Sequence, residues 1–361
     1  MPERIFNFAA GPATLPYSVL EQAAKDIVNF NDKGIGLIEM SHRSKEFVAV
    51  ADRTEALLRE LMGIPNNYKV LFLQGGASSQ FFMVPMNLLG PDRKATYLNT
   101  GTWSKKAIKE AKLFGQVEVA WSSEEQNFTS VPRDDEYTVA ADSQYLYFVT
   151  NNTIYGTQYP AMPNKDALLI ADMSSDILSR PVDVSRFGLI FAGAQKNMGP
   201  AGVTVVIIRE DLLDRVPAQV PTMLKYKTHA DKDSMFNTPP CFSIYCVGLV
   251  LQWLKDLGGV PAIERLNRDK AALLYQAIDS TDFYRGHAER DSRSLMNVTF
   301  NLPTPELEAQ FVREATAVGL DGLKGHRSVG GCRASIYNAF PREGVVKLVE
   351  FMREFERANP A

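Results

Sequence analysis

Residues 189–202 read LIFAGAQKNMGPAG, an apolar run that leads directly into small residues around a lysine. The run Leu189–Ala192 is typical of a strand that is covered on both faces of a sheet. The glycines on either side of Lys196 would let another group approach the backbone closely. In so crowded and partly apolar a setting, desolvation disfavours the ammonium form, and a neutral amine is a nucleophile toward an aldehyde. The stretch therefore predicts a Schiff-base lysine, Lys196, at the end of a buried strand.

Similar apolar runs earlier in the chain predict further strands of the same sheet. Helical patterns separate the first of them, and the one at 103–114 has four lysines on one face and Ala107, Ile108 and Ala111 on the other. Strands that alternate with helices form a largely parallel sheet covered on both faces. We therefore predict an α/β fold with a large domain built on a mostly parallel, seven-stranded sheet. The runs are Tyr68–Leu73, Ala95–Leu98, Val117–Trp121, Tyr145–Val149, Leu168–Ala171, Leu189–Ala192 and Val203–Ile208.

The pattern changes in the last third of the chain. Residues 225–237 are polar without periodicity, and an apolar helix is then predicted over 242–257, ending at a glycine pair. A second helix begins at Pro261 and runs to 279. Beyond it, two strands and two helices, at 297–302, 305–318, 334–339 and 343–357, predict a smaller α+β C-terminal domain. We divide the chain into an N-terminal segment (1–15) near the candidate site, a large domain (16–260) and a small domain (261–361).

Composition excludes several classes of protein. The 361 residues are 45% hydrophobic and 22% charged, as in ordinary globular proteins. The 39 Lys and Arg against 42 Asp and Glu give a net charge of −3, so no global positive field favours nucleic acid or an anionic membrane. Three cysteines without CxxC or zinc spacing predict neither disulfides nor a metal site. Without a secretory signal or a run of about 18 apolar residues, we expect a cytoplasmic soluble protein.

Asp172 follows the predicted strand that precedes the one leading to Lys196. One connection and one strand fit between the two residues. The carboxyl ends of neighbouring parallel strands converge on the crevice where ligands bind, so both side chains are expected in one site. Taken alone, a carboxylate and an amine at such positions are more often an ordinary ion pair.

A glycine-rich turn, residues 74–80 (QGGASSQ), comes directly after a strand and before a helix. Free N–H groups and the dipole at a helix start favour an anion, so the turn could hold a phosphate. It lacks the lysine of nucleoside triphosphatases and the full spacing of dinucleotide binders. The alternative is a plain tight turn in which Ser78 or Ser79 caps the helix. Trp103, at the next strand-to-helix junction, is either a stacking face for a flat ring or a core residue.

A lysine that reacts with aldehydes, a carboxylate, an anion cup and an aromatic face are the parts that a pyridoxal phosphate site requires. The sequence resembles the class V, fold-type I pyridoxal phosphate enzymes, and more closely the phosphoserine aminotransferases. The resemblance covers essentially the whole chain. Its motifs are Phe6–Ala13, Ser41–Phe47, Gly193–Asn197, Phe236–Pro240 and Gly325–Arg333.

The resemblance implies two catalytic residues and a homodimer. Lys196 would bind the cofactor covalently and later carry a proton, and Asp172 would keep the pyridine nitrogen protonated. Two of the cofactor residues, Asn237 and Thr238, usually come from the second subunit. The full cofactor set is Ala77, Ser78, Trp103, Thr153, Asp172, Gln195, Lys196, Asn237 and Thr238.

The implied substrates are glutamate and 3-phosphohydroxypyruvate, which give 2-oxoglutarate and O-phospho-L-serine in serine biosynthesis. A related phosphooxybutanoate of pyridoxine biosynthesis is a further implied substrate. Arg333 would grip the α-carboxylate, since a planar guanidinium suits a carboxylate. The basic residues for the substrate phosphate or the glutamate side chain would come from both subunits, and they are His42, Arg43, His326 and Arg327.

The sequence departs from the family at two places. Ala10 stands where some relatives have a serine near the substrate, and Ala77-Ser78 replaces a glycine and an arginine of other members. One hydroxyl contact and one phosphate contact are therefore in doubt. No required chemical group is missing.

Three other classes of function compete with an aminotransferase. A cysteine desulfurase would use Cys332, directly before Arg333, although the neighbouring glycines and strand favour a packing role. A noncatalytic cofactor-binding regulator would not need Arg333, His326 and Arg327. A nucleotide-dependent transferase could use Gly75-Gly76 and Lys196, but this sequence lacks the motifs by which such enzymes bind nucleotides.

Overall fold

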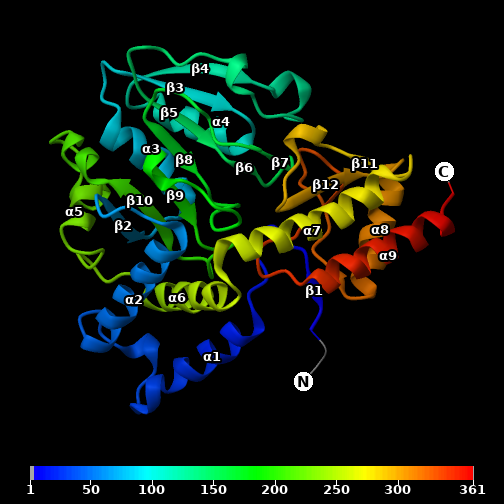
Figure 1. The fold of residues 1–361 in the computed structure, drawn as a ribbon, viewed down its shortest axis with the longest axis horizontal. Coiled ribbons are helices and arrows are strands. Elements are labelled where there is room, and N and C mark those ends of the chain that lie inside the picture. The colour runs from blue at the N-terminus through cyan, green and yellow to red at the C-terminus, as the bar shows by residue number, and fades with distance from the viewer. Residues whose placement is uncertain (1–3, 361) are drawn as a thin grey trace.

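The computed structural model describes residues 4–360 and is built on a seven-stranded sheet (Figure 1). The strand order is β2-β10-β9-β8-β5-β3-β4. Only β10 runs opposite to the other six strands, so the predicted mostly parallel, seven-stranded sheet is confirmed. The strands are β2 (Tyr68–Leu73), β3 (Lys94–Asn99), β4 (Gln116–Ser122), β5 (Ser143–Val149), β8 (Leu169–Asp172), β9 (Phe187–Gly193) and β10 (Thr204–Arg209).

One of the seven strands is not buried as predicted. β4 lies at an edge of the sheet and pairs only with β3, and its residues are half-buried or exposed. Val119 of β4 is 42% exposed. An apolar run in the sequence does not distinguish an edge strand from a central one, because burial depends on which strands pair on each side.

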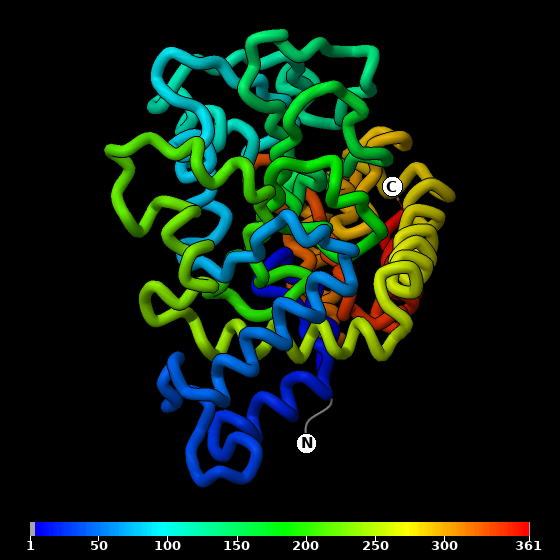
Figure 2. Tube along the Cα trace, turned by 60° about the vertical axis from the view of Figure 1, so that its left-hand side comes forward, coloured from blue at the N-terminus to red at the C-terminus, as the bar shows by residue number. Residues whose placement is uncertain are grey.

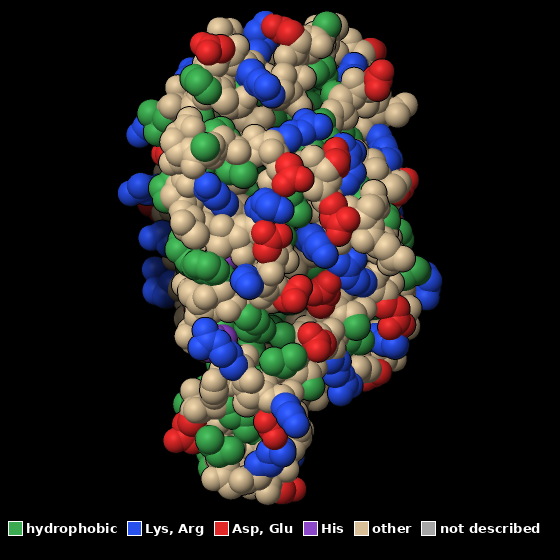
Figure 3. Space-filling view, turned by 90° about the vertical axis from the view of Figure 1, so that its left-hand side faces the viewer, with side chains coloured by type: hydrophobic (Ala, Val, Ile, Leu, Met, Phe, Trp, Pro, Cys, Tyr) green, Lys and Arg blue, Asp and Glu red, His purple; other side chains and the backbone are tan. Residues whose placement is uncertain are grey.

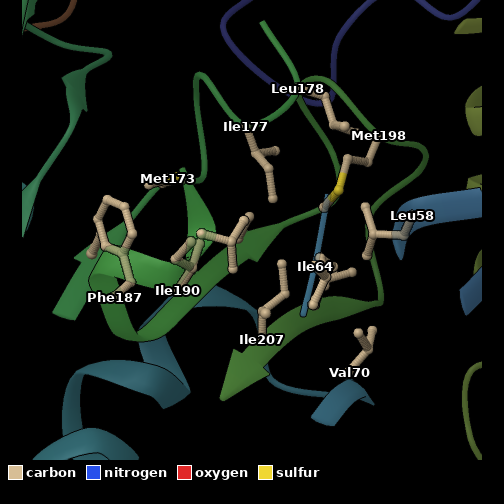
Figure 4. Close-up of a cluster of buried hydrophobic side chains, with 14 of the residues drawn as sticks. Leu58, Ile64, Val70, Met173, Ile177, Leu178, Phe187, Ile190, Met198 and Ile207 are labelled. Atoms are coloured by element: carbon tan, nitrogen blue, oxygen red, sulfur yellow. The ribbon is translucent and has the colours of Figure 1, made fainter. Parts of the chain in front are cut away.

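Helices cover both faces of the sheet. α3 (Gly76–Leu88) and α4 (Thr102–Ala111) pack on one face. α2 (Lys45–Met62) and α6 (Cys241–Asp256) pack on the other, where Leu58, Ile190 and Ile207 belong to the apolar cluster shown in Figure 4. These two apolar layers make the sheet a rigid base for the residues at its strand ends. The short helix α5 (Tyr226–Ala230) lies in the stretch where the sequence shows no periodicity.

The last third of the chain forms a smaller unit around the sheet β11-β12-β14, with its own apolar core (Figure 1). The first strand of the chain, β1 (Phe6–Asn7), pairs with β13 (Leu320–Asp321), so the N-terminal segment belongs structurally to this unit. The elements are α7 (Gly259–Asp279), β11 (Arg285–Gly286), β12 (Asn297–Asn301), α8 (Pro305–Ala317), β14 (Cys332–Ser335) and α9 (Arg342–Ala358). The domain boundary near residue 260 stays a prediction.

Several element ends differ from expectation by a few residues, and two of the differences have a clear cause. α7 begins at Gly259 rather than Pro261, because Gly258 and Gly259 both adopt the left-handed conformation that turns the chain between α6 and α7. β14 ends at Ser335 rather than 339. Beyond it, the carbonyls of Ile336 and Tyr337 accept hydrogen bonds from the buried ammonium of Lys270 and so leave the strand ladder.

α1 (Tyr17–Val28) and the segment that follows it project from one end of the molecule, as Figure 2 shows in dark blue. The space-filling view shows the same narrow projection below the body, with basic and acidic side chains intermingled over that face (Figure 3). Within residues 4–360 no single helix is long and apolar enough to cross a membrane, and α6 with α7 reaches that length only as a pair bent by 82°.

Candidate active site

The carboxyl ends of β8 and β9 meet in a pocket of about 340 Å³. Asp172 is the last residue of β8, and Lys196 lies shortly after the end of the adjacent strand β9, as the sequence predicts. Both side chains line the pocket. A larger cavity of about 490 Å³ lies between α1, α2 and α6, but it contains none of the candidate residues. The other residues that line the pocket are Ala10, Gly11, Gly76, Ala77, Ser78, Phe81, Trp103, Val149, Asn151, Thr153, Ile154, Ser174, Ser175, Gly193, Gln195, His326 and Arg333.

The amine of Lys196 is held by one hydrogen bond. Its Nζ donates to Thr153 Oγ1 at 2.7 Å. Burial lowers the pKa of Lys196 to about 8; the Asp172 carboxylate opposes this shift and the Arg333 guanidinium adds to it. At neutral pH about a tenth of such an amine is neutral and able to attack an aldehyde. The sequence prediction that this lysine is partly desolvated is therefore matched by its surroundings.

Asp172 is a buried carboxylate that is fixed from within its own loop. Its Oδ1 accepts a hydrogen bond from the N–H of Ser174 at 2.9 Å. Burial raises the pKa of Asp172, while the bond from Ser174 and the charge of Lys196 lower it. Ser174 Oγ also accepts the N–H of Gly193 at 3.2 Å, which ties the ends of β8 and β9 together. Sequence reasoning missed Ser174, although an Asp that binds the amide two residues on is a recognisable turn pattern.

The glycine-rich turn is an open helix start. α3 begins at Gly76, and its N-cap residue Gly75 has φ of +93° with no side-chain cap. Ser79 Oγ donates back to the Gly75 carbonyl at 3.1 Å, so the alternative in which Ser78 or Ser79 caps the helix is wrong. Ala77 and Ser78 line the pocket at this helix start, where the dipole favours an anion.

Trp103, in the first turn of α4, packs partly against the core and also lines the pocket, so its core role is observed and its stacking role stays a prediction. Its ring centre lies 6.0 Å from Lys196 Nζ and 4.6 Å from Lys106 Nζ. Its buried Nε1 has no hydrogen-bond partner among the described residues.

Arg333 reaches the same pocket from β14 of the smaller unit. Its Nη1 donates to the carbonyl of Thr153 at 3.3 Å, and its buried Nε has no partner within the described part of the chain. Burial lowers the pKa of Arg333. No carboxylate of the described residues forms an ion pair with it, so its fork is available to a carboxylate from outside.

His326 lines the pocket opening, and its Nδ1 lies 2.6 Å from Ser328 Oγ. Burial lowers the pKa of His326, as do the nearby charges of Arg333, Arg327 and Lys106. Arg327 is exposed and lies outside the pocket lining.

The chain does not bring the other predicted residues into its own pocket. His42 is buried with its Nε2 unpartnered, and Arg43 beside it is exposed. Asn237 lines a separate cavity behind the glycine-rich turn, and the carbonyl of Thr238 accepts a hydrogen bond from Gln74 at 3.2 Å. The roles of these four residues stay predictions, as do the roles of the others.

The pocket as a whole fits pyridoxal phosphate. A partly desolvated amine suits its aldehyde, the Asp172 carboxylate suits its ring nitrogen, and the uncapped start of α3 suits its phosphate. Two of the residues that line the pocket, Trp103 and Arg333, each have a buried nitrogen donor without a partner in the described part of the chain. Residues 4–360 contain no group of three or more His, Cys, Asp or Glu that could hold a metal ion.

Comparison with known proteins agrees with this geometry. The family model for class-V aminotransferases matches residues 5–348, which places the fold and the pocket in that class. A phosphoserine aminotransferase of Desulfotalea psychrophila is 71% identical over all of both chains. The solved phosphoserine aminotransferase of Bacillus circulans subsp. alkalophilus is 51% identical, with a TM-score of 0.96 over 98% of this chain and 99% of that one.

A third relative, from Trichomonas vaginalis, is a phosphoserine aminotransferase solved with its cofactor PLP bound; it is 40% identical, with a TM-score of 0.93 over 97% of this chain and all of that one. The chain belongs to the phosphoserine aminotransferase family of class-V aminotransferases. The resemblance inferred from the sequence motifs is confirmed.

Proposed function

We propose that this chain is a pyridoxal phosphate-dependent aminotransferase that transfers the amino group of glutamate to 3-phosphohydroxypyruvate, giving 2-oxoglutarate and O-phospho-L-serine. One observation carries the chemistry. The Lys196 amine and the Asp172 carboxylate, from adjacent strand ends, share a pocket with an arginine that has no acidic partner among the described residues. The substrate pair follows from membership of a family whose relatives carry the name phosphoserine aminotransferase.

The residues that would hold the cofactor are those already in the pocket. Lys196 would bind its aldehyde carbon, Ala77 and Ser78 its phosphate, Trp103 the ring face and Asp172 the ring nitrogen. When bound, the cofactor supplies an electron-withdrawing ring that stabilises negative charge at the substrate Cα. A carboxylate facing the nitrogen keeps that ring cationic, and the bond from Ser174 helps Asp172 stay ionised in spite of its burial.

The chain's own residues then direct a proton. Arg333 would bind the substrate α-carboxylate with its fork and so fix the position of Cα. Burial lowers the pKa of the Lys196 amine to about 8, so this group would be able to accept the Cα proton and give it back near neutral pH. The hydroxyl of Thr153, 2.7 Å from Nζ, orients the amine for both transfers.

The rival function of a cysteine desulfurase is not supported by the position of Cys332. The residue is 1% exposed and packs in the core of the smaller unit, and burial raises the pKa of its thiol. A thiol held there cannot attack a substrate in the pocket. We expect Cys332→Ala to keep activity within about twofold while unfolding about 1 kcal/mol more easily, measured by steady-state assay and chemical denaturation. Complete loss of activity in a folded variant would restore the rival.

The cofactor and its chemistry are tested by the visible absorption spectrum of the purified protein. The yellow band should bleach with glutamate and return with 3-phosphohydroxypyruvate. A band that answers only to cysteine, with release of sulfide, would favour the desulfurase. A cofactor band that no amino acid changes would favour a noncatalytic regulator, and a protein that stays colourless with added cofactor would overturn the assignment of Lys196. The same titration with 3-hydroxy-2-oxo-4-phosphooxybutanoate tests the second implied substrate.

The active sites are shared between two subunits of a homodimer in this proposal. Its support is that His42, Arg43, Asn237 and Thr238 match family positions around the ligand but do not line the pocket of their own chain. Lys196→Ala should be inactive alone, and Arg43→Gln should be nearly inactive alone when 3-phosphohydroxypyruvate is kept well below its raised KM; under those conditions the two should form mixed dimers in which one of the two sites has both wild-type residues. Activity that appears on mixing, together with a dimeric mass by light scattering, supports the sharing. A mixture as inactive as its components would contradict it.

A cytoplasmic location also belongs to the proposal. Its support is that Cys241, Cys246 and Cys332 are all free thiols, two of them buried, which suits a reducing compartment. Fractionation of cells that produce the protein would test it, and enrichment outside the cytoplasm would contradict it.

A further inference from the structure

The loop 325–331, here called the recognition loop, carries His326 and Arg327 and joins β13 to β14. Its backbone closes on itself. The N–H of Gly325 donates to the carbonyl of Gly331 at 2.9 Å, and the N–H groups of Val329 and Gly330 both donate to the carbonyl of His326 at 2.9 Å. A Cβ on Gly325 would lie 2.0 Å from the Gly330 carbonyl oxygen, so the base of the loop is tightly packed. The loop therefore has a definite shape of its own.

That shape does not by itself place the loop over the pocket. Gly330 and Gly331 both adopt positive φ where the loop meets β14, and Glu308 Oε2 accepts the N–H of Gly331 at 2.9 Å, which fixes the base of the loop but not its tip. Arg327 and Ser328 are exposed. Moreover, Arg327 and Arg333 bring two like charges near His326, whose pKa is lowered first by burial and then by these charges. Two guanidinium groups close together repel each other, so a contact is needed that holds the loop when no anion is bound.

Val329 is the only aliphatic side chain of the recognition loop, and it makes an apolar contact across to the sheet domain. It packs against Phe128, Ile154 and Tyr155, with Trp103 at the edge of the same cluster. The surface that receives it is firm. The rings of Phe128 and Tyr155 lie 4.8 Å apart, and the Tyr155 hydroxyl shares a hydrogen bond of 3.1 Å with Thr102, at the start of α4. Val329 therefore joins the loop to the element that carries Trp103.

We propose that Val329 is a positioning residue for substrate recognition: its contact with Phe128, Ile154 and Tyr155 holds His326 and Arg327 at the pocket opening, where they receive the distal anionic group of the substrate. The proposal rests on the proposed function for its substrate class. It assigns the side chain no part in the chemistry at Cα, since it lies outside the pocket lining. A distal anion is therefore recognised only while the apolar contact is made.

The test uses the holoenzyme with Val329→Ala and, as a conservative rescue, Val329→Ile. In Val329→Ala we expect KM for 3-phosphohydroxypyruvate to rise about tenfold, since truncation removes most of the contact, while kcat changes by less than about twofold. The half-reaction with L-alanine, which has no distal anionic group, should keep its rate. Val329→Ile keeps a branched apolar side chain, so its KM for 3-phosphohydroxypyruvate should stay close to that of the wild type. Val318→Ala is the matched control, because Val318 is 64% exposed on the same unit and should change neither quantity.

A second measurement does not depend on catalysis. Trypsin should cut after Arg327 several times faster in Val329→Ala than in the wild type or Val318→Ala, with the melting temperature and the cofactor absorbance unchanged. Equal cleavage together with an unchanged KM would overturn the proposal. Equal losses with L-alanine and with 3-phosphohydroxypyruvate would also overturn it, since Val329 would then support the pocket as a whole. If the enzyme does not use 3-phosphohydroxypyruvate, the proposed function fails, and the cleavage rates still decide whether Val329 holds the loop.

Discussion

The floor of the pocket, formed by Asp172 and Lys196, and its opening, formed by His326, Arg327 and Arg333, differ in whether their charged groups have partners. On the floor, each reactive group has a partner: Asp172 accepts the N–H of Ser174, and Lys196 donates to Thr153. At the opening, His326, Arg327 and Arg333 form no ion pair with a carboxylate of the described residues, and two of them depress the pKa of the third. The floor is complete before a substrate binds, whereas the opening is completed by the anion it receives. Changes to the floor should therefore lower kcat, and changes to the opening should raise KM.

The largest expected effect breaks the floor. Lys196→Ala removes the nucleophile and the proton carrier in one substitution, so turnover should fall by about 10⁴-fold or more while the protein stays folded. Rapid-quench measurement of 2-oxoglutarate checks this, with Lys109→Ala on the exposed side of α4 as the control. Residual turnover above about one per cent of wild type would refute the assignment of Lys196.

A second substitution, in Asp172, tests whether the charge of this buried side chain matters apart from its burial. Asp172→Asn keeps the size of the side chain but removes the charge that faces the cofactor, and kcat should fall by about 10² to 10³-fold with little change in KM. Asp176→Asn is the matched control, because Asp176 is equally buried but bonds Thr150 and Gln158 and lies outside the pocket lining. It should lower the melting temperature more than kcat. Equal losses of kcat in the two variants would show that the charge of Asp172 has no special role.

The opening is tested by Arg327→Gln. Loss of a charged hydrogen-bonding group should raise KM for 3-phosphohydroxypyruvate by about 10 to 100-fold and leave the affinity for the cofactor unchanged. Steady-state kinetics and cofactor titration of the apoprotein measure the two quantities. Arg353→Gln, an exposed position on α9, should change neither. If the affinity for the cofactor falls as much as the affinity for the substrate, Arg327 also supports the cofactor site and does not belong to the opening alone.

The smallest effect sharpens the comparison by pH. An amine attacks an aldehyde only when neutral, and burial lowers the pKa of Lys196 to about 8. The rate at which apoprotein takes up pyridoxal phosphate should rise roughly tenfold per pH unit below that value and level off above it. Absorbance-monitored uptake checks the profile. Since Arg333 lowers this pKa, Arg333→Gln should move the midpoint to higher pH. A midpoint that stays fixed would mean that floor and opening are electrostatically independent.

Much of the fold could be predicted because strands covered on both faces are read as continuous apolar runs. Each of the seven strands of the large sheet overlaps a predicted run, although the edge strand β4 is only partly covered. The pairing of β1 with β13 could not be predicted, since two residues show no periodicity and their partners lie more than three hundred residues away. Helix α5 was not predictable for a similar reason, because a five-residue helix gives too short a pattern.

The site divides in the same way. Asp172 and Lys196 could be paired from the sequence because strand ends of a parallel sheet converge. Ser174 was missed because it acts on Asp172 and Gly193 through hydrogen bonds, with its amide and its hydroxyl, that depend on how the ends of β8 and β9 lie side by side. The contact of Val329 with Phe128 joins two loops on different units, and no local pattern records such a contact. The placement of His42 and Arg43 depends on a second chain in our proposal, and a single sequence carries no geometry for that.

The pairing of β1 with β13 also bears on synthesis. Gly11, shortly after β1, sits so close to Lys196 that a Cβ there would lie 3.4 Å from its Cγ. The strand β1, which leads to Gly11, can pair only after residues 320–321 have been synthesised, and Arg333 is synthesised after them. A chain emerging from the ribosome can therefore fold its large sheet early, but the pocket lining is complete only when nearly the whole chain has been synthesised. The catalytic centre is the last part of the molecule to be finished, and cofactor capture is expected to follow translation rather than accompany it.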